Sequence, residues 1–495
     1  MSLSRKKSLD VLLAQAADSE KGLKRTLGAW SLVALGIGAI IGAGLFVRTA
    51  AAAGEHAGPA VTISFLVAAV GCAFAGLCYA EFASMIPIAG SAYTYAYTTM
   101  GEVVAWIIGW ALVLEYALGA ATVSISWSEY LNKLLGGTIP FEWCHSPFEK
   151  VLDTATGVMH HGIINIPALV ILLALSLLLM KGTEESATVN GIIVFIKVAI
   201  VLVFIAIGWQ FVNPANHHPY VIPADAPPAL MRDGTSYSYE GFFRHGWGGI
   251  LSGAGIVFFA FIGFDAVSTA AQEAKNPAKH MPIGILGSLV VCTILYVLFS
   301  WVLTGVAPYT DFVKSGKEAS VAYAIETYMH GYHWLSVLVT IAILAGFSSV
   351  ILVMLLGQSR VFYTMATDGL LPKVFCELHP KFRTPYKSNM ILFVFVGLFA
   401  GFIPESVAGN LTSIGTLFAF ILVSIGVVIL RKSDPTRPRP FKTPLVPIVP
   451  ALGVLVCTAM IIGLDTATQV TALVWMLIGL IIYYGYSKNH SKLKA

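Results

Sequence analysis

The sequence predicts an all-α membrane protein that crosses the bilayer many times. Of its 495 residues, 57% are hydrophobic and only 11% are charged, and the mean hydropathy is +0.79. Soluble domains carry about 25% charged residues. Apolar runs longer than about 18 residues recur along the chain. The apolar surface therefore faces lipid, and an array of soluble domains is excluded.

Each long apolar run is expected to form one helix, because the hydrocarbon core offers no partners for loose backbone groups. The runs predict twelve transmembrane helices near residues 29–53, 60–84, 103–130, 163–181, 188–210, 248–272, 283–306, 334–360, 388–404, 410–430, 447–466 and 470–487. Residues 1–28 are polar and lack a cleavage site, so we expect a tail rather than a signal peptide. Within it, the stretch from Leu9 to Leu27 is either a short surface helix or a solvated tail.

The lysines and arginines sort by side of the membrane. If the N-terminus is cytoplasmic, the inner segments hold 22 of the 30, the outer segments hold seven, and Lys197 lies inside a span. The positive-inside rule then places both termini in the cytoplasm, with the protein in the cell membrane. A net charge of +4 is too small to suggest nucleic acid. The six cysteines include no CxxC pair, so no metal site is indicated.

Two glycine-rich interruptions indicate an internal repeat. One lies within 36–46 in the first span, and the other lies within 258–265 in the sixth. Each opens a run of five spans, and because five is odd the second run is inverted relative to the first. Paired interruptions in inverted halves point to a transporter site at the bilayer midplane. The predicted organisation is an N-terminal tail 1–28, repeats 29–210 and 248–430, an extracellular loop 211–247, a cytoplasmic loop 431–446, helices eleven and twelve at 447–487, and a tail 488–495.

The two interruptions have complementary chemistry. Gly36 and Gly38 also fit close helix packing, but for Gly42-Ala43-Gly44 we prefer an unwound backbone. A new helix start there exposes N–H groups that favour a substrate carboxylate. A break near Ala260 to Gly263 exposes carbonyls that suit an ammonium group. Together they predict a clamp for a zwitterion.

Three ionisable residues lie deep within the predicted spans: Glu115, Lys197 and Asp265. Intramembrane charges are expensive and by default indicate function. We favour a proton-coupling role for Lys197 over a structural tether. Burial disfavours its charged form, whereas carbonyls exposed at the break favour it, so this lysine can switch between the two protonation states. Glu115 either faces the substrate amine or pairs structurally, and Asp265 either caps the second half-helix or contributes to the site. Glu81 lies near a span end, where gate pairing or snorkelling is favoured over substrate contact.

Five blocks of the chain resemble the amino acid–polyamine–organocation (APC) superfamily of transporters, and in detail its cationic amino acid transporter family. They are GIGAIIGAGLF at 36–46, YAEFASMIPIAGSAYTYAY at 79–97, FFAFIGFDAVSTAAQEAKNPAKHMPIGI at 258–285, RVFYTMATDGLLPKVF at 360–375 and RPRPFKTPLVPIVP at 437–450. The resemblance implies a LeuT-type 5+5 inverted repeat with two extra C-terminal helices. Twelve spans with short tails look like a bacterial homologue, since animal members have fourteen spans.

The resemblance also assigns roles to particular residues. It implies a carboxylate-binding backbone at Gly42, Ala43 and Gly44, and amine-binding carbonyls at Ile40, Phe259, Ala260 and Ile262. Phe259 takes the place of the aromatic outer gate. Lys197 fits the lysine that replaces sodium in proton-coupled relatives, so a sodium site is disfavoured and protons are the expected coupling ion, with no other cofactor.

Substrate preference depends on Met354, which stands where animal cationic members have a small residue. A bulky thioether would shorten the pocket, which favours small neutral or broadly selected L-amino acids. The sequence thus predicts a secondary transporter, not an enzyme, that imports L-amino acids with protons by alternating access. An exchanger or a cationic amino acid transporter using the same site is the alternative, and a non-transporting sensor or scaffold is the alternative of another class.

Overall fold

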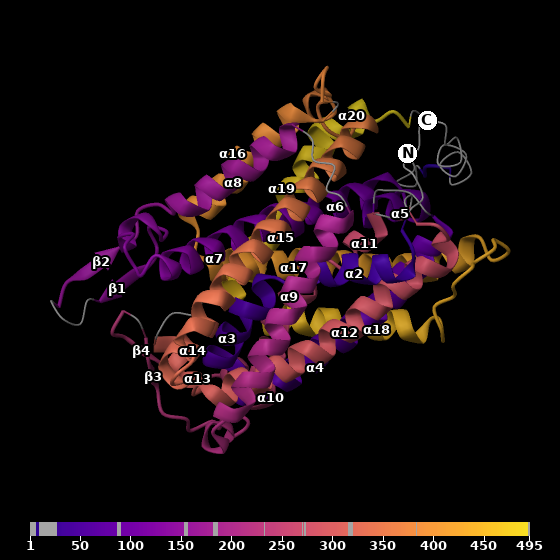
Figure 1. The fold of residues 1–495 in the computed structure, drawn as a ribbon. Helices are drawn as coiled ribbons and strands as arrows, with labels where there is room; N and C mark the ends of the chain where they lie inside the picture. Colours follow the sequence, from indigo (N-terminus) through magenta and orange to yellow (C-terminus); the bar gives the residue numbers. More distant parts are fainter. Residues whose placement is uncertain are drawn as a thin grey trace.

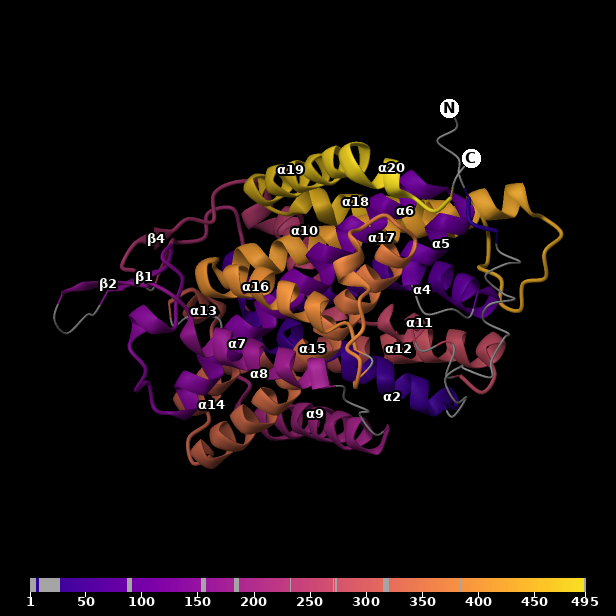
Figure 2. The same cartoon turned by 90° about the horizontal axis from the view of Figure 1, so that it is seen from above.

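The computed structural model describes residues 6–8, 27–86, 91–152, 157–181, 187–231, 233–269, 271, 274–314, 320–382 and 384–493. These residues fold mainly into helices that run alongside one another (Figures 1 and 2). The strands within the described ranges form two small antiparallel hairpins, β1 (Lys150–Leu152) with β2 (Met159–His161) and β3 (Ala229–Leu230) with β4 (Ser236–Tyr237). The predicted all-α membrane class is confirmed.

In the described part of the chain, seven helical runs are long and apolar enough to cross a membrane, and five further apolar helices are shorter. The main helices are α2 (Ala29–Ile40), α4 (Val61–Met85), α6 (Glu102–Val113), α7 (Gly119–Leu134), α8 (Ile166–Lys181), α9 (Ala187–Gly208), α10 (Gly246–Val257), α12 (Pro277–Val306), α15 (His333–Thr367), α16 (Tyr386–Phe402), α17 (Glu405–Ser433), α18 (Ile448–Gly463) and α19 (Thr466–Ile482). The short helices are α3 (Thr49–Ala52), α5 (Ser91–Thr99), α11 (Ala266–Thr269), α13 (Tyr309–Lys314), α14 (Ser320–Tyr328) and α20 (Lys488–His490).

Several helices extend past their predicted ends, because apolar runs mark the bilayer core rather than the helix. α12 begins at Pro277, six residues before the apolar run that starts at 283, because the Asn276 side chain caps it by accepting from the Lys279 N–H at 3.4 Å. Likewise α15 continues to Thr367, beyond the predicted end at 360. The surface helix considered for 9–27 lies outside the described residues, except for Leu27.

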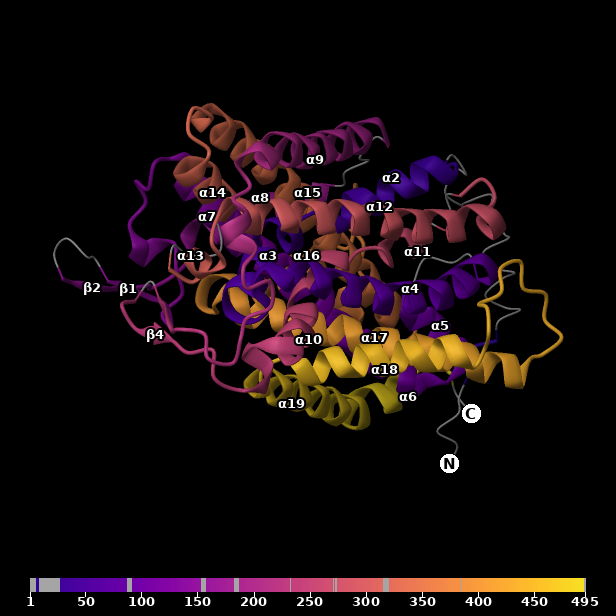
Figure 3. The same ribbon diagram turned by 90° about the horizontal axis from the view of Figure 1, so that it is seen from below.

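The helix bundle has two ends. The two hairpins lie at one end, which we call the hairpin face (Figures 1 and 3). At the opposite end, which we call the tail face, Lys7 and Lys492 meet the same turn. The ammonium group of Lys7 contacts Asp368 Oδ1 at 2.8 Å, and the Lys492 N–H donates to the Asp368 carbonyl at 3.0 Å. Tyr93 donates to the second oxygen of the Asp368 carboxylate at 2.9 Å.

The two predicted interruptions lie in the core of this bundle. α2 packs against α12 and α9, and α10 packs against α4 and α18. The residues of both interruptions, from Ile40 to Phe46 and from Phe258 to Asp265, are buried. The breaks are therefore enclosed by protein on all sides, which is where a membrane protein tolerates irregular backbone.

Candidate functional site

The first interruption is an unwound step followed by a new helix. α2 ends at Ile40, and Ile41 is extended (φ −72°, ψ 109°). Helix resumes with a π-helical turn over Gly44–Arg48, in which the N–H groups of Leu45 and Phe46 donate to the Gly42 carbonyl at 3.2 and 3.4 Å. The peptide N–H groups from Gly42 to Gly44 thus begin a helix, and such groups have no acceptor within that helix. They form the kind of positive end that binds an anion.

The second interruption is tighter. α10 narrows into a 3-10 turn over Phe258–Phe261, and Ile262 is then extended (φ −60°, ψ 135°). Gly263 has φ +112°, a left-handed conformation that favours glycine. Helix resumes at Ala266 in α11. The carbonyls released at the end of α10 form the negative counterpart of the first break.

The two breaks touch each other through their glycines. A Cβ at Gly44 would lie 2.2 Å from Ala260 Cα, and one at Gly263 would lie 2.8 Å from the Ala39 carbonyl oxygen. Each interruption therefore contributes a glycine that lies directly on the backbone of the other. The predicted anion-binding and ammonium-binding groups are brought together at a single location.

Tyr296 of α12 joins the two breaks. Its fully buried hydroxyl lies 3.1 Å from the Ile40 carbonyl and 2.8 Å from the Ala260 carbonyl. These are two of the carbonyls that the family resemblance assigns to the substrate amine. The sequence analysis missed this residue, since a tyrosine inside an apolar span carries no signal that distinguishes it from packing.

Lys197 lies against the first break from α9. Its ammonium group donates to the Gly38 carbonyl at 2.7 Å, and its side chain is 2% exposed. A Cβ at Gly346 of α15 would lie 3.1 Å from Lys197 Cε, so the absence of a side chain there leaves room for the lysine. The expected proximity of Lys197 to carbonyls of the first span is confirmed; its coupling role stays a prediction.

Glu115 and Asp265 form a buried acidic pair beside the second break. Glu115 lies in a π-helical turn between α6 and α7, next to Asp265 and Thr416. Despite that proximity, neither carboxylate oxygen of Glu115 makes a hydrogen bond of good geometry to a described residue. Asp265 accepts a hydrogen bond from the Tyr116 hydroxyl at 2.8 Å. Two adjacent carboxylates in a dry site are not both charged without a cation, so the pair suits an ammonium group or a proton.

The remaining predicted residues line the helices around the breaks. Met354 on α15 is buried, and its sulfur would lie 2.8 Å from a Cβ at Gly119 of α7. One turn earlier, Val350 lies against Gly42, where a Cβ would be 3.1 Å from its methyl group. Phe259 is buried within the 3-10 turn. The structure thus places Val350 nearer than Met354 to the first break.

Buried charged pairs lie toward both ends of the bundle. Toward the hairpin face, Arg48 pairs with Glu405 at 3.2 Å, and both are buried. Toward the tail face, buried Glu81 pairs with Arg431 at 2.7 Å and with Arg439 at 3.3 Å. Of the two alternatives for Glu81, gate pairing or snorkelling, the structure shows ion pairs, and a role as a gate stays a prediction. No role is assigned to Arg48 by the sequence.

Broken helices that meet in the core of a membrane bundle, with helix starts and carbonyl ends facing each other, are typical of secondary transporters. Comparison with known proteins agrees with this class. The chain belongs to the amino acid permease family of the APC superfamily, whose family model matches residues 27–485. It is a transporter and not an enzyme.

Relatives lie in both bacteria and plants. The chain is 45% identical over 494 residues to the branched-chain amino acid permease BcaP of Bacillus subtilis, covering 99% of both chains. It is 39% identical over 492 residues to the methylthioribose transporter of the same species, again covering 99% of both. It is 35% identical over 435 residues to the vacuolar cationic amino acid transporter 4 of Arabidopsis thaliana, covering 88% of this chain and 68% of the relative. The resemblance drawn from the sequence is confirmed.

Proposed function

We propose that this protein imports neutral L-amino acids together with protons by alternating access. In this proposal the chain crosses the cell membrane twelve times, as two inverted five-helix repeats followed by α18 and α19. The tail face, which carries Lys7 and Lys492, is cytoplasmic, in agreement with the distribution of lysine and arginine.

The contact between the two breaks is the observation that carries the proposal. Gly44 lies against Ala260, so the helix start of the first break and the carbonyl end of the second lie side by side. An α-amino acid carries a carboxylate and an ammonium group on one carbon, which matches both ends at once. The ligand groups assigned here are the backbone of Gly42, Ala43 and Gly44 for the carboxylate, and the carbonyls of Ile40, Phe259, Ala260 and Ile262 for the amine.

Proton coupling is assigned to Lys197. Its ammonium group holds the Gly38 carbonyl just before the first break. Loss of the proton weakens that contact and shifts the balance between conformations, which is the requirement for a coupling ion. The buried carboxylate of Glu115 is a second candidate, because it lies next to Asp265 beside the second break.

The side-chain end of the pocket is assigned to the apolar face of α15 that carries Val350 and Met354. The relative named a branched-chain amino acid permease supports small aliphatic side chains. Met354→Ser should admit longer or cationic substrates, because selectivity depends partly on exclusion. Arginine binding and uptake that do not change in this variant would remove Met354 from the pocket.

Three alternatives use the same fold. An exchanger or a cationic amino acid transporter would use the same two breaks, and a sensor would bind without transport. The relative named a methylthioribose transporter adds a substrate without a carboxylate or an α-amine. Glu115 favours an ammonium-bearing ligand over such a sugar, since its buried carboxylate gains a cationic partner.

Purified protein in liposomes tests these options together. We expect L-leucine or L-valine to accumulate only with an inward proton gradient, and leucinamide to compete poorly because the helix-start N–H groups lose their anion. Equal competition by the amide would sink the carboxylate placement. Uptake that requires internal amino acid instead of a proton gradient would indicate exchange, binding without any uptake would indicate a sensor, and preference for methylthioribose would overturn the amino acid assignment.

A further inference from the structure

An apolar cavity of about 240 Å³ lies between α17, α19 and the chain around the π-helical turn Leu114–Leu118. Its inner wall includes Ala111, Leu114 and Ala472, which are all buried. Its mouth includes Leu473, which is 61% exposed. The cavity therefore reaches from the surface of α19 to the π-helical turn. For comparison, an apolar protein cavity of about 150 Å³ already binds benzene.

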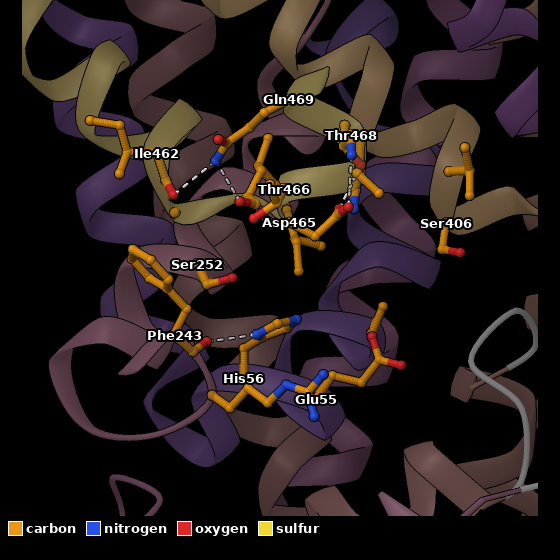
Figure 4. A pocket seen from close by; sticks show the side chains of 18 of the residues that line it. Glu55, His56, Phe243, Ser252, Ser406, Ile462, Asp465, Thr466, Thr468 and Gln469 are labelled. Atoms are coloured by element: carbon orange, nitrogen blue, oxygen red, sulfur yellow. Dashed lines mark hydrogen bonds between the residues drawn. The ribbon is translucent and has the colours of Figure 1, made fainter. Parts of the chain in front are cut away.

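Gln469 marks the polar end of this cavity. It is the only polar side chain among the described residues that line the apolar cavity, and it also lines a polar cavity at the hairpin face (Figure 4). Its amide donates to the carbonyls of Ile461 at 3.1 Å, Ile462 at 3.1 Å and Leu464 at 2.8 Å. A buried water needs about two to four polar partners. The side chains of the cavity offer few, so hydrocarbon is favoured over water.

The cavity lies at the depth of lipid acyl chains. α19 begins at Thr466 on the side of the hairpin face, and Ala472 and Met476 lie about 9 and 15 Å further along it. One leaflet contributes about 15 Å of hydrocarbon. Leu473, Leu477 and Ile481 are exposed at four-residue intervals, which places them on one outer face of α19. The mouth of the cavity is therefore continuous with the lipid-facing surface, and lipid is the occupant that surrounds it.

On its inner side the cavity borders the turn that positions Glu115. α17 approaches this turn closely because a Cβ at Gly415 would lie 2.6 Å from Leu114 Cβ and 2.9 Å from the Ala111 carbonyl oxygen. The next residue, Thr416, lies beside Glu115. A gap next to Leu114 leaves its side chain without van der Waals partners on that side, whereas an occupant restores them. Filling the cavity therefore restricts a π-helical turn, and such turns are frequent at functional sites.

We propose that this cavity binds one acyl chain of a bilayer phospholipid, which enters past Leu473 and packs against Leu114 at the turn that carries Glu115. Binding of the chain requires only that the protein lies in a membrane, whereas its effect on uptake rests on the proposed function. The bound chain limits movement of the turn relative to α17 and α19. Uptake therefore depends on whether the chains of the surrounding lipid fit into the cavity.

Photolabelling tests the entry of the chain. The purified protein is placed in dioleoylphosphatidylcholine vesicles that contain a phosphatidylcholine with a diazirine halfway along one acyl chain. After illumination we expect label on Ala111 or Leu114, which are buried and out of reach of lipid on the outer surface. Label confined to exposed residues of α19, such as Leu473, would indicate ordinary surrounding lipid and overturn the proposal.

Two matched variants test the location. Ala472→Leu fills the cavity from α19 and should reduce labelling of Ala111 and Leu114 about tenfold. Ala451→Leu makes the same exchange at an exposed position of α18 outside the cavity and should leave the labelling unchanged. Should Ala472→Leu fail to fold, Ala472→Val takes its place with a smaller reduction. Labelling that persists in the filled cavity would overturn the proposal.

Uptake in two lipids tests the effect on transport. Diphytanoylphosphatidylcholine has methyl-branched chains that are thicker than oleoyl chains. The wild type and Ala451→Leu should accumulate L-leucine about fivefold more slowly in this lipid than in dioleoylphosphatidylcholine. Ala472→Leu should be equally active in both lipids, because leucine replaces the chain. Equal wild-type rates in the two lipids would overturn the effect of the acyl chain on uptake.

The outcomes separate this proposal from the proposed function. Labelling of the inner wall without uptake of L-leucine would support the acyl-chain site and overturn the transport proposal, and uptake without such labelling would do the reverse. Loss of the label on addition of oleic acid would assign the cavity to a free fatty acid. A disulfide between two copies of Leu473→Cys, in a Cys376→Ser background that removes the one native cysteine that is not buried, would assign the mouth to a second copy. Either result would overturn the phospholipid assignment.

Discussion

The two helix breaks have a similar role in the proposed site, but different features fix their backbone conformations. The first break uses ordinary backbone angles, and its positions depend on neighbours: Lys197 holds Gly38, and Ala260 lies on Gly44. The second break is fixed largely by its own chain, through a 3-10 turn and the left-handed Gly263. From this difference we expect the first break to move during transport and the second to stay fixed.

The largest effect should come from Gly263→Ala. The substitution forces a side chain into φ +112° and places its Cβ 2.8 Å from the Ala39 carbonyl oxygen. We expect a loss of about 3 kcal/mol in the free energy of unfolding, with uptake abolished. Thermal unfolding in detergent measures the first and proteoliposome uptake the second. A stable, active Gly263→Ala protein would mean that the second break need not stay fixed.

Next in size is the coupling effect at Lys197. Lys197→Ala should abolish proton-driven accumulation and leave L-leucine binding measurable, because the proposed clamp is backbone. Lys197→Arg should fail equally, since arginine keeps its charge but does not readily lose its proton. Uptake in liposomes beside equilibrium binding in detergent provides the readout. If either variant accumulates substrate like the wild type, Lys197 is a structural tether, and Glu115 becomes the coupling candidate.

A smaller effect is expected for Tyr296→Phe, which removes a hydroxyl that contacts carbonyls of both breaks. The loss of a hydrogen bond to the Ile40 and Ala260 carbonyls should weaken L-leucine binding by about 1 kcal/mol, or roughly fivefold. Isothermal titration or radioligand binding measures this. Tighter binding instead would indicate that the hydroxyl competes with the substrate amine for these carbonyls.

The smallest effect is expected for Gly42→Ala, which makes in the first break the same substitution that Gly263→Ala makes in the second. Its Cβ meets a flexible contact, the Val350 methyl at 3.1 Å, which can shift by a few tenths of an ångström. We expect a cost below about 1 kcal/mol and binding within about threefold of wild type. A loss of binding as large as that of Gly263→Ala would remove the contrast between an adaptable and a fixed break.

Local chemistry made the breaks predictable from the sequence. Glycine interruptions in two spans pointed to 36–46 and 258–265, and an isolated lysine in an apolar run pointed to Lys197. The contacts of Tyr296 and the pairing of Arg48 with Glu405 could not be predicted in this way. Those partners lie far apart along the chain, and their meeting depends on how the helices pack. The spacing of hydrophobic residues does not encode such packing.

The contact of Lys7 and Lys492 with the Asp368 turn has a practical consequence for handling the protein. Affinity tags and fluorescent fusions are usually placed beside one of these two segments, and either placement adds chain next to the turn at Asp368, which follows α15. A tag at either position is therefore expected to disturb the contacts of Lys7 and Lys492 with the Asp368 turn. Uptake should therefore be measured with the tag beside each segment in turn and again after its removal by protease. The difference between tagged and untagged protein gives the effect of the tag in the other assays.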